Sequence, residues 1–166
     1  MNEQDMQVFE IIVNGLINIG RGVTTEKVLE KAKALDISEE STQESIRIIY
    51  DSGHLDATDL GHNSFLIKGL SPSGIRLYSM ELNPDYESQV ESIACHIANT
   101  PKNDSDSISN ALGIELFIVN NALKELQARN YLKLKDATTV DSRNQYCYIV
   151  SDISPALIRE CKGKGR

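Results

Sequence analysis

The chain has 166 residues, of which 40% are apolar and 25% charged, which is ordinary globular usage and argues against a disordered protein. No apolar run approaches the roughly 18 residues of a membrane span, and the acidic start is unlike a secretory signal, so we expect a cytoplasmic protein with no membrane partner. The net charge of −7, from 17 basic and 24 acidic residues, disfavours binding to phosphate backbones.

The first 35 residues predict two helices with a short extended piece between them. Apolar side chains recur every three or four residues from Met6 to Ile17, which is the spacing of an amphipathic helix. Gly20 ends this helix, and Thr25 is placed to cap the second one. The side chains expected on the buried side of the second helix are Val28, Leu29, Ala32 and Leu35.

The next 45 residues predict a helix, a hairpin and a further helix. Ser38 is a favourable N-cap for the third helix, and Gly53 follows its end. Two apolar segments, residues 55–60 and 65–67, flank a Gly-His-Asn-Ser turn and predict a β-hairpin. Ser71, followed by proline, opens the fourth helix.

The second half of the chain repeats the first. A shift of 77 positions superposes apolar on apolar residues, and past the hairpin the shift becomes 83, so the second copy carries six extra residues within 135–145. At the larger shift Ser71 falls on Ser154, and a proline follows both. The pairs at the smaller shift include Val13 and Val90, Leu16 and Ile93, Leu35 and Leu112, Ile37 and Ile114, Ile46 and Leu123, Ile49 and Leu126, and Leu55 and Leu132.

The elements expected in the second copy follow the same order. Asn83 and Pro84 are predicted to open its first helix, which Thr100 and Pro101 stop. Gly113 lies in the turn between helices two and three. The remaining elements are hairpin strands at 131–134 and 146–150, a last helix that begins at Ser154-Pro155, and a short mobile basic tail at 162–166.

Each copy therefore follows the winged helix-turn-helix plan. The predicted fold class is mainly α with small β-hairpin wings (α+β), as two tandem domains at 1–82 and 83–166. The segment 62–78, with Leu70-Ser71-Pro72-Ser73-Gly74, resembles the wing-to-last-helix segment of bacterial winged-helix proteins, among them the YjcQ-like family. The resemblance covers about the first 80 residues and implies nucleic-acid binding and regulation. Leu157 replaces Gly74 in the second copy, so a different start of the last helix is expected there.

The predicted recognition helix of the first copy is poorly suited to DNA. In such modules the third helix enters the major groove and needs donors for phosphates and base edges. Residues 1–83 hold 7 basic and 13 acidic residues, a net charge of −6. Glu39 and Glu40 begin the helix, and Arg47 is its one basic residue, so a structural or protein-binding role is favoured.

The second copy is closer to neutral, with 10 basic and 11 acidic residues, a net charge of −1. Amides can pair with adenine, while lysine and arginine can hold phosphates or guanine. Ordinary solvated surface residues are the competing interpretation. The predicted base contacts are Asn120, Asn121, Lys124 and Gln127, and the predicted phosphate contacts are Lys133, Lys135 and Arg143.

Four consecutive apolar residues at 116–119 open the same helix. Because such a run cannot face one side of a helix, we expect at least one of them, Phe117 or Ile118, to be exposed. The exposed side chain would contact the sister copy, another chain or a protein partner. Burial by packing between the two repeats is the alternative.

No catalytic pattern is present in the sequence. It contains no glycine-rich phosphate loop, no G-x-S-x-G and no H-E-x-x-H motif, so we expect neither an enzyme nor a cofactor. The thiols of Cys95, Cys147 and Cys161 are odd in number and lack C-x-x-C spacing, which predicts reduced, buried side chains without a disulfide framework or a zinc site.

Two functions remain open from the sequence. The leading hypothesis is a regulatory protein that binds duplex DNA through its second copy. The competing hypothesis is a protein-interaction module, a scaffold or an inhibitor, with no nucleic-acid role. Its contact residues would be Phe117, Ile118, Glu39 and Glu40, and homo-oligomers are possible in either case.

Overall fold

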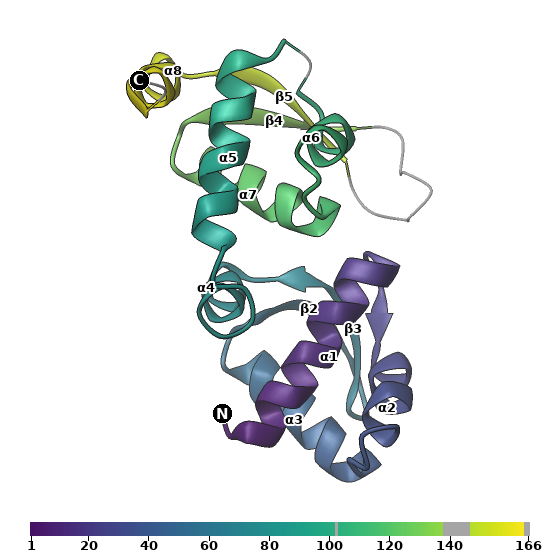
Figure 1. Cartoon of the computed structure of the whole chain (residues 1–166). Helices are drawn as coiled ribbons and strands as arrows, with labels where there is room; N and C mark the ends of the chain where they lie inside the picture. The colour runs from purple at the N-terminus through teal and green to yellow at the C-terminus, as the bar shows by residue number, and fades with distance from the viewer. Residues whose placement is uncertain (102, 138–146, 165–166) are drawn as a thin grey trace. The chain divides into compact units, whose positions relative to one another are not determined.

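A computed structural model describes residues 1–101, 103–137 and 147–164, and the structural statements below refer to these residues. The chain divides into two compact units, Met1–Asn83 and Pro84–Arg166. Each unit consists of helices followed by an antiparallel hairpin and a last helix (Figure 1). The predicted fold class, mainly α with small β-hairpins, is confirmed.

The first unit combines four helices with a three-stranded antiparallel sheet of order β1-β3-β2. The predicted extended piece at Val23 is β1, an edge strand of this sheet, and it pairs with β3, where Val23 lies opposite Ile67. His62 and Asn63 form the hairpin turn, and both have positive φ, as two-residue turns that match the twist of the strands require. The elements are α1 (Glu3–Ile19), β1 (Val23–Thr24), α2 (Thr25–Lys33), α3 (Glu39–Asp51), β2 (Leu55–Gly61), β3 (Ser64–Leu70) and α4 (Pro72–Glu81).

The second unit repeats this order with a smaller sheet. Strands β4 and β5 form its hairpin, and a single bridge between Asp104 and Ile149 stands where the first unit has β1. Gly113 ends α6 in the left-handed conformation, with φ of 64°, as its place in the turn predicts. The elements are α5 (Tyr86–Asn99), α6 (Ser105–Leu112), α7 (Leu116–Ala128), β4 (Leu132–Asp136), β5 (Tyr148–Ile153) and α8 (Pro155–Lys164).

The two units use the same hydrogen bonds at structurally equivalent positions, although the first residues of their second helices, Thr25 and Ser105, lie 80 positions apart rather than 77. The Thr25 hydroxyl accepts the Phe65 N–H at 2.8 Å, and the Ser105 hydroxyl accepts the Tyr148 N–H at 2.7 Å. Both bonds join the second helix of a unit to the second strand of its hairpin, which is β3 in the first unit and β5 in the second. Two backbone bonds correspond in the same way, Ser71 N–H to His54 O at 3.1 Å and Ser154 N–H to Tyr131 O at 2.8 Å. The repeat read from the sequence is therefore a repeat of structure.

The last helices differ in packing rather than in their start. Both begin at the proline after the matched serine, so the different start expected for the second copy is wrong. In α4, a Cβ on Gly74 would lie 2.0 Å from the carbonyl oxygen of His54, so glycine lets this helix lie against the hairpin. Leu157 occupies the matched position of α8, is buried, and belongs to a helix that packs against α5.

Four local predictions are wrong. The N-cap of α2 is Thr24, so Thr25 is the first residue of the helix and does not cap it. Helix α5 begins at Tyr86 with Asp85 as its N-cap, so Asn83 and Pro84 do not open it. Helix α8 continues through Lys164, so the predicted basic tail is helical up to that residue. Leu35 lies beyond the end of α2 and is 59% exposed rather than buried.

The apolar run at the start of α7 is fully buried. Phe117 is 8% exposed and Ile118 is 5% exposed, and the residues on either side are more deeply buried still. Helix α7 packs against α5, α6 and β4, so apolar side chains meet neighbours on several sides of the helix. The expectation that Phe117 or Ile118 is exposed is therefore wrong, and neither presents a surface for a partner.

Candidate binding surfaces

The amide side chains predicted to read bases on α7 take part in the fold. The Gln127 Oε1 accepts the backbone N–H of Leu134 at 2.8 Å and so ties α7 to β4. The Asn121 Nδ2 donates to the carbonyl of Phe117 at 2.9 Å, one turn earlier in the same helix. Asn120 is half-buried. These hydrogen bonds hold the amides of Asn121 and Gln127 in place and reduce what they offer to base edges.

Three lysines on α7 and β4 are exposed. Lys124 lies on α7, with its Nζ 5.7 Å from the centre of the Tyr148 ring. Lys133 and Lys135 are alternate residues of β4 and therefore share one face of that strand, with Leu132 buried on the other. The Lys133 Nζ lies 4.0 Å from a carboxylate oxygen of Asp152, a weak interaction between exposed groups. Arg143 lies outside the described residues.

Other basic groups of the second unit are engaged in ion pairs. Arg129 pairs with Glu125 one turn earlier on α7, and Lys164 Nζ lies 2.6 Å from Glu91 on α5. The hydrogen bond from Lys164 to Glu91 raises the pKa of the lysine. The cationic side chains of α7 and β4 are therefore mainly Lys124, Lys133 and Lys135, which we call the lysine cluster. Because Tyr148 pairs with Asp136, Lys124 lies beside one face of the hairpin, and Lys133 and Lys135 point to the other.

The equivalent surface of the first unit is acidic. Glu39 and Glu40 are exposed at the start of α3, as are Glu44 and Asp51 further along. Arg47, the basic residue of this helix, binds the hairpin. Its Nη1 lies 2.8 Å from an oxygen of Asp59, and its guanidinium lies 4.7 Å from the centre of the Phe65 ring.

The carboxylate that Arg47 meets is stabilised in its charged form. The backbone N–H of Gly61 and the Arg47 guanidinium both donate to Asp59 and lower the pKa of its carboxyl group. Helix α3 thus presents carboxylates outward while its arginine anchors the hairpin. This surface would repel phosphates.

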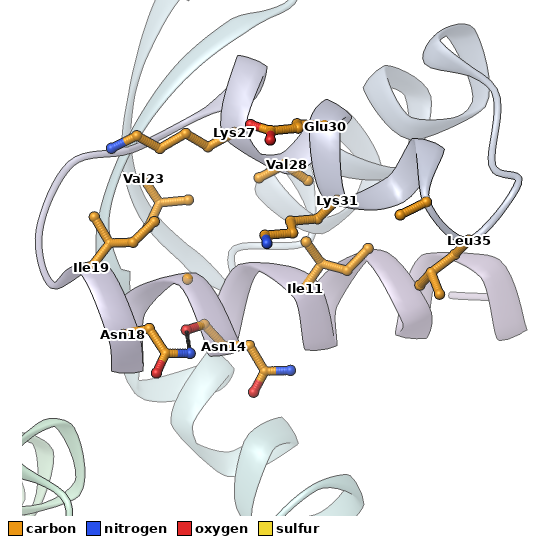
Figure 2. Close-up of a pocket in the computed structure, with 12 residues that line it drawn as sticks. Ile11, Asn14, Asn18, Ile19, Val23, Lys27, Val28, Glu30, Lys31 and Leu35 are labelled. Atoms are coloured by element: carbon orange, nitrogen blue, oxygen red, sulfur yellow. Dashed lines mark hydrogen bonds between the residues drawn. The ribbon is translucent and has the colours of Figure 1, made fainter.

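A groove of about 700 Å³ runs between α1 and α2 of the first unit. Figure 2 shows Ile11 and Ile19 of α1 along one side of it, Lys27 and Lys31 of α2 on the other, and Leu35 at one end. The two isoleucines are half-buried and Leu35 is exposed. The sequence pattern did not predict this groove, because it placed Leu35 in the core.

The described residues contain no group of three or more His, Cys, Asp or Glu side chains that could hold a metal ion. Among these residues, no helix is both long and apolar enough to cross a bilayer. No protein-family model matches the chain, and no curated protein matches it significantly. The order of helices and hairpins is consistent with two winged-helix-like units, while the resemblance to the YjcQ-like family stays a prediction.

Proposed function

We propose that the chain is a non-catalytic binding protein whose second unit contacts the phosphate backbone of duplex DNA. The lysine cluster is the observation that carries this proposal, because it lies on the recognition helix and the adjacent wing strand of a winged-helix unit. In this architecture those are the elements that approach the groove and the flanking backbone. The assignment of DNA as the ligand rests in part on that analogy of fold.

The contacts proposed are with phosphates more than with bases. Lysine is a flexible point charge that suits a phosphate oxygen. The amides of Asn121 and Gln127 are held by hydrogen bonds within the unit, so we expect weak discrimination between sequences. The near-neutral net charge of this unit also limits affinity, since long-range attraction to DNA is small.

Fluorescence anisotropy with a mixed-sequence duplex at increasing salt tests the proposal. Three phosphate contacts predict a slope of about −2.7 for log affinity against log salt, which is roughly a 40-fold loss between 50 and 200 mM. Replacing Lys124, Lys133 and Lys135 together with alanine should bring that slope close to zero and weaken binding at every salt concentration.

A matched control replaces three lysines of the first unit, Lys27, Lys31 and Lys68, with alanine. This variant has the same change of net charge as the first but leaves the lysine cluster intact, so binding and salt slope should match those of the parent chain. Equal losses in both variants would indicate non-specific attraction to net charge. Unchanged binding in the cluster variant, or none by the parent at low salt, would reject the proposal.

A second candidate function is the binding of a partner protein by the first unit. The groove between α1 and α2 favours it, because aliphatic side chains line the groove and the exposed carboxylates of Glu39 and Glu40 follow Leu35 closely in sequence. The occupant that fits is an amphipathic helix whose apolar face enters the groove, whose acidic residues meet Lys27 and Lys31, and whose basic residues meet Glu39 and Glu40.

Site-specific photo-crosslinking in cells tests this candidate. A photoreactive residue at Leu35 should give one discrete adduct, and the same residue at Met80, which is exposed on α4 of the same unit, should not. Replacing Glu39 and Glu40 with lysine should abolish the adduct. Equal labelling from both positions, or labelling at Leu35 that survives the charge reversal, would exclude this partner.

A further inference from the structure

Two thiols that lie 66 residues apart in sequence meet in the second unit. Cys95 on α5 and Cys161 on α8 face each other, and the Cys95 S–H donates to the Cys161 Sγ at 2.9 Å. Cys161 is buried, whereas Cys95 is partly exposed and reaches solvent. The third thiol, Cys147, is buried just before β5.

We propose that Cys95 and Cys161 form a redox site, which a hydroperoxide or a low-molecular-weight disulfide converts into an intramolecular disulfide. A disulfide needs a sulfur–sulfur distance of about 2.05 Å, so closure requires a movement of about 1 Å between two helices that already pack together. This inference goes beyond the proposed function and does not depend on it.

The reaction with a small disulfide RSSR proceeds in two exchange steps. The Cys95 thiolate attacks one sulfur of RSSR, forming a Cys95–S–S–R bond and releasing RS⁻. Cys161 then loses its proton to solvent, and its thiolate attacks the Cys95 sulfur and releases the second RS⁻. Two electrons pass from the protein to RSSR, and the released thiolates take up the two protons. With a hydroperoxide ROOH, the Cys95 thiolate takes the outer oxygen as the O–O bond breaks, and ROH leaves after protonation. Cys161 then attacks the sulfur of the resulting sulfenic acid, which forms the disulfide and releases water.

The environment assigns different roles to the two thiols. Burial raises the pKa of the Cys161 thiol to about 12. Thiolates rather than thiols are the nucleophiles, so Cys161 is a poor first attacker. Cys95 is the more accessible thiol and reacts first, while Cys161 completes the bond, at a rate that should rise with pH.

The disulfide would fix α8 covalently to α5. At present α8 is held by the buried Leu157, by a 2.8 Å bond from the Tyr131 hydroxyl to Glu160, and by the ion pair of Lys164 with Glu91. Closing a loop of this length restricts the unfolded chain, so oxidation should raise the Tm of the second unit by roughly 10 °C.

Incubating the reduced full-length chain with oxidised glutathione, at low protein concentration, tests the proposal. The expected product has lost two hydrogen atoms in its intact mass and retains one free thiol of three. Peptide mapping without reductant should identify a fragment that joins Cys95 to Cys161, and dithiothreitol should reverse the change. This measurement uses the unmutated chain and needs no variant to fold.

Variants separate the two steps. Cys161→Ala should stop at a glutathione adduct on Cys95, while the matched control Cys147→Ser should form the disulfide like the parent chain. Three unreacted thiols, a disulfide that includes Cys147, or a glutathione adduct that persists on Cys95 of the parent chain would each overturn the proposal.

Discussion

The two units share a backbone plan and differ in what they do with three positions on it. In both, a hydroxyl at the start of the second helix binds the returning strand, and a serine cap opens the last helix at the same repeat position. The units differ at Gly74 and Leu157, at Ser45 and Ala122, and at the caps Thr24 and Asp104. The bond from the second helix to the hairpin and the serine cap of the last helix are repeated. The packing of the last helix, the bond between the first and third helices and the cap of the second helix differ.

The first of these differences sets the place of the last helix. Glycine at position 74 removes the side chain that would meet the His54 carbonyl, and α4 lies against the hairpin. A leucine at the matched position of α8 must be buried elsewhere, and α8 packs on α5. That packing brings Cys161 to Cys95. The thiol pair is thus a consequence of how the second copy departs from the first.

The second difference concerns the tie between the first and third helices of each unit. In the first unit the buried Asp5 carboxylate accepts the Ser45 hydroxyl at 2.7 Å and the Asn2 N–H at 2.8 Å. In the second unit Ala122 occupies the place of Ser45, and the Tyr86 hydroxyl bonds Glu125 at 3.2 Å instead. The same two helices are joined by different chemistry.

The largest effect should come from replacing Gly74 of the first unit with leucine, the residue that the second unit carries at the matched position 157. Gly74→Leu places a side chain against backbone that cannot withdraw, and we expect it to destabilise the first unit by roughly 3 kcal/mol or more in urea unfolding. Gly69→Ala is the control, because a Cβ there meets open space, and it should change stability by less than about 1 kcal/mol. Equal stability of Gly74→Leu and the parent chain would contradict the explanation that Gly74 lets α4 pack against the hairpin.

A smaller effect should follow from removing the buried carboxylate. Asp5→Ala leaves the Ser45 hydroxyl without its acceptor and breaks the capping box of α1, at an expected cost of about 2 kcal/mol. The double variant with Ser45→Ala should cost less than the sum of the two single variants, because they remove the same bond. Strict additivity in a double-mutant cycle would show that the two side chains act independently.

The smallest effect concerns pH and the cap of α6. Burial acts to raise the pKa of Asp104, but the hydrogen bonds from Ser107 outweigh it and leave the pKa below its ordinary value. A carboxyl group with a lowered folded-state pKa stabilises the fold above its unfolded pKa of about 3.9, and this contribution is lost as the pH falls through the folded value. Thr24, the matched cap of α2, carries no charge itself, although its hydroxyl, after the Glu26 backbone N–H, lowers the pKa of the exposed Glu26.

Asp104→Asn keeps a hydrogen-bond acceptor at the cap but cannot titrate. We expect it to cost about 0.5 kcal/mol at pH 7, and the difference from the parent chain should shrink as the pH falls below about 4. Urea unfolding of both chains at pH 7 and pH 3 measures this. A difference that stays constant with pH would show that the charge of Asp104 contributes nothing to the cap.

Local sequence patterns predict the helices, the hairpins and their repetition. The structure confirms the helical spacing in α1, the serine caps of α3 and α4, and the glycine that ends α6, because the cause of each lies within a few residues. The duplicated order of these elements then indicated two winged-helix units.

Tertiary structure alone decided which of these surfaces are available. The burial of Phe117 and Ile118, the exposure of Leu35 and the use of Gln127 to hold β4 depend on neighbours distant in sequence. The meeting of Cys95 and Cys161 does so as well. Periodicity gives the face of a helix on which a side chain lies, but only packing determines what covers that face, and the candidate binding surfaces follow from that packing.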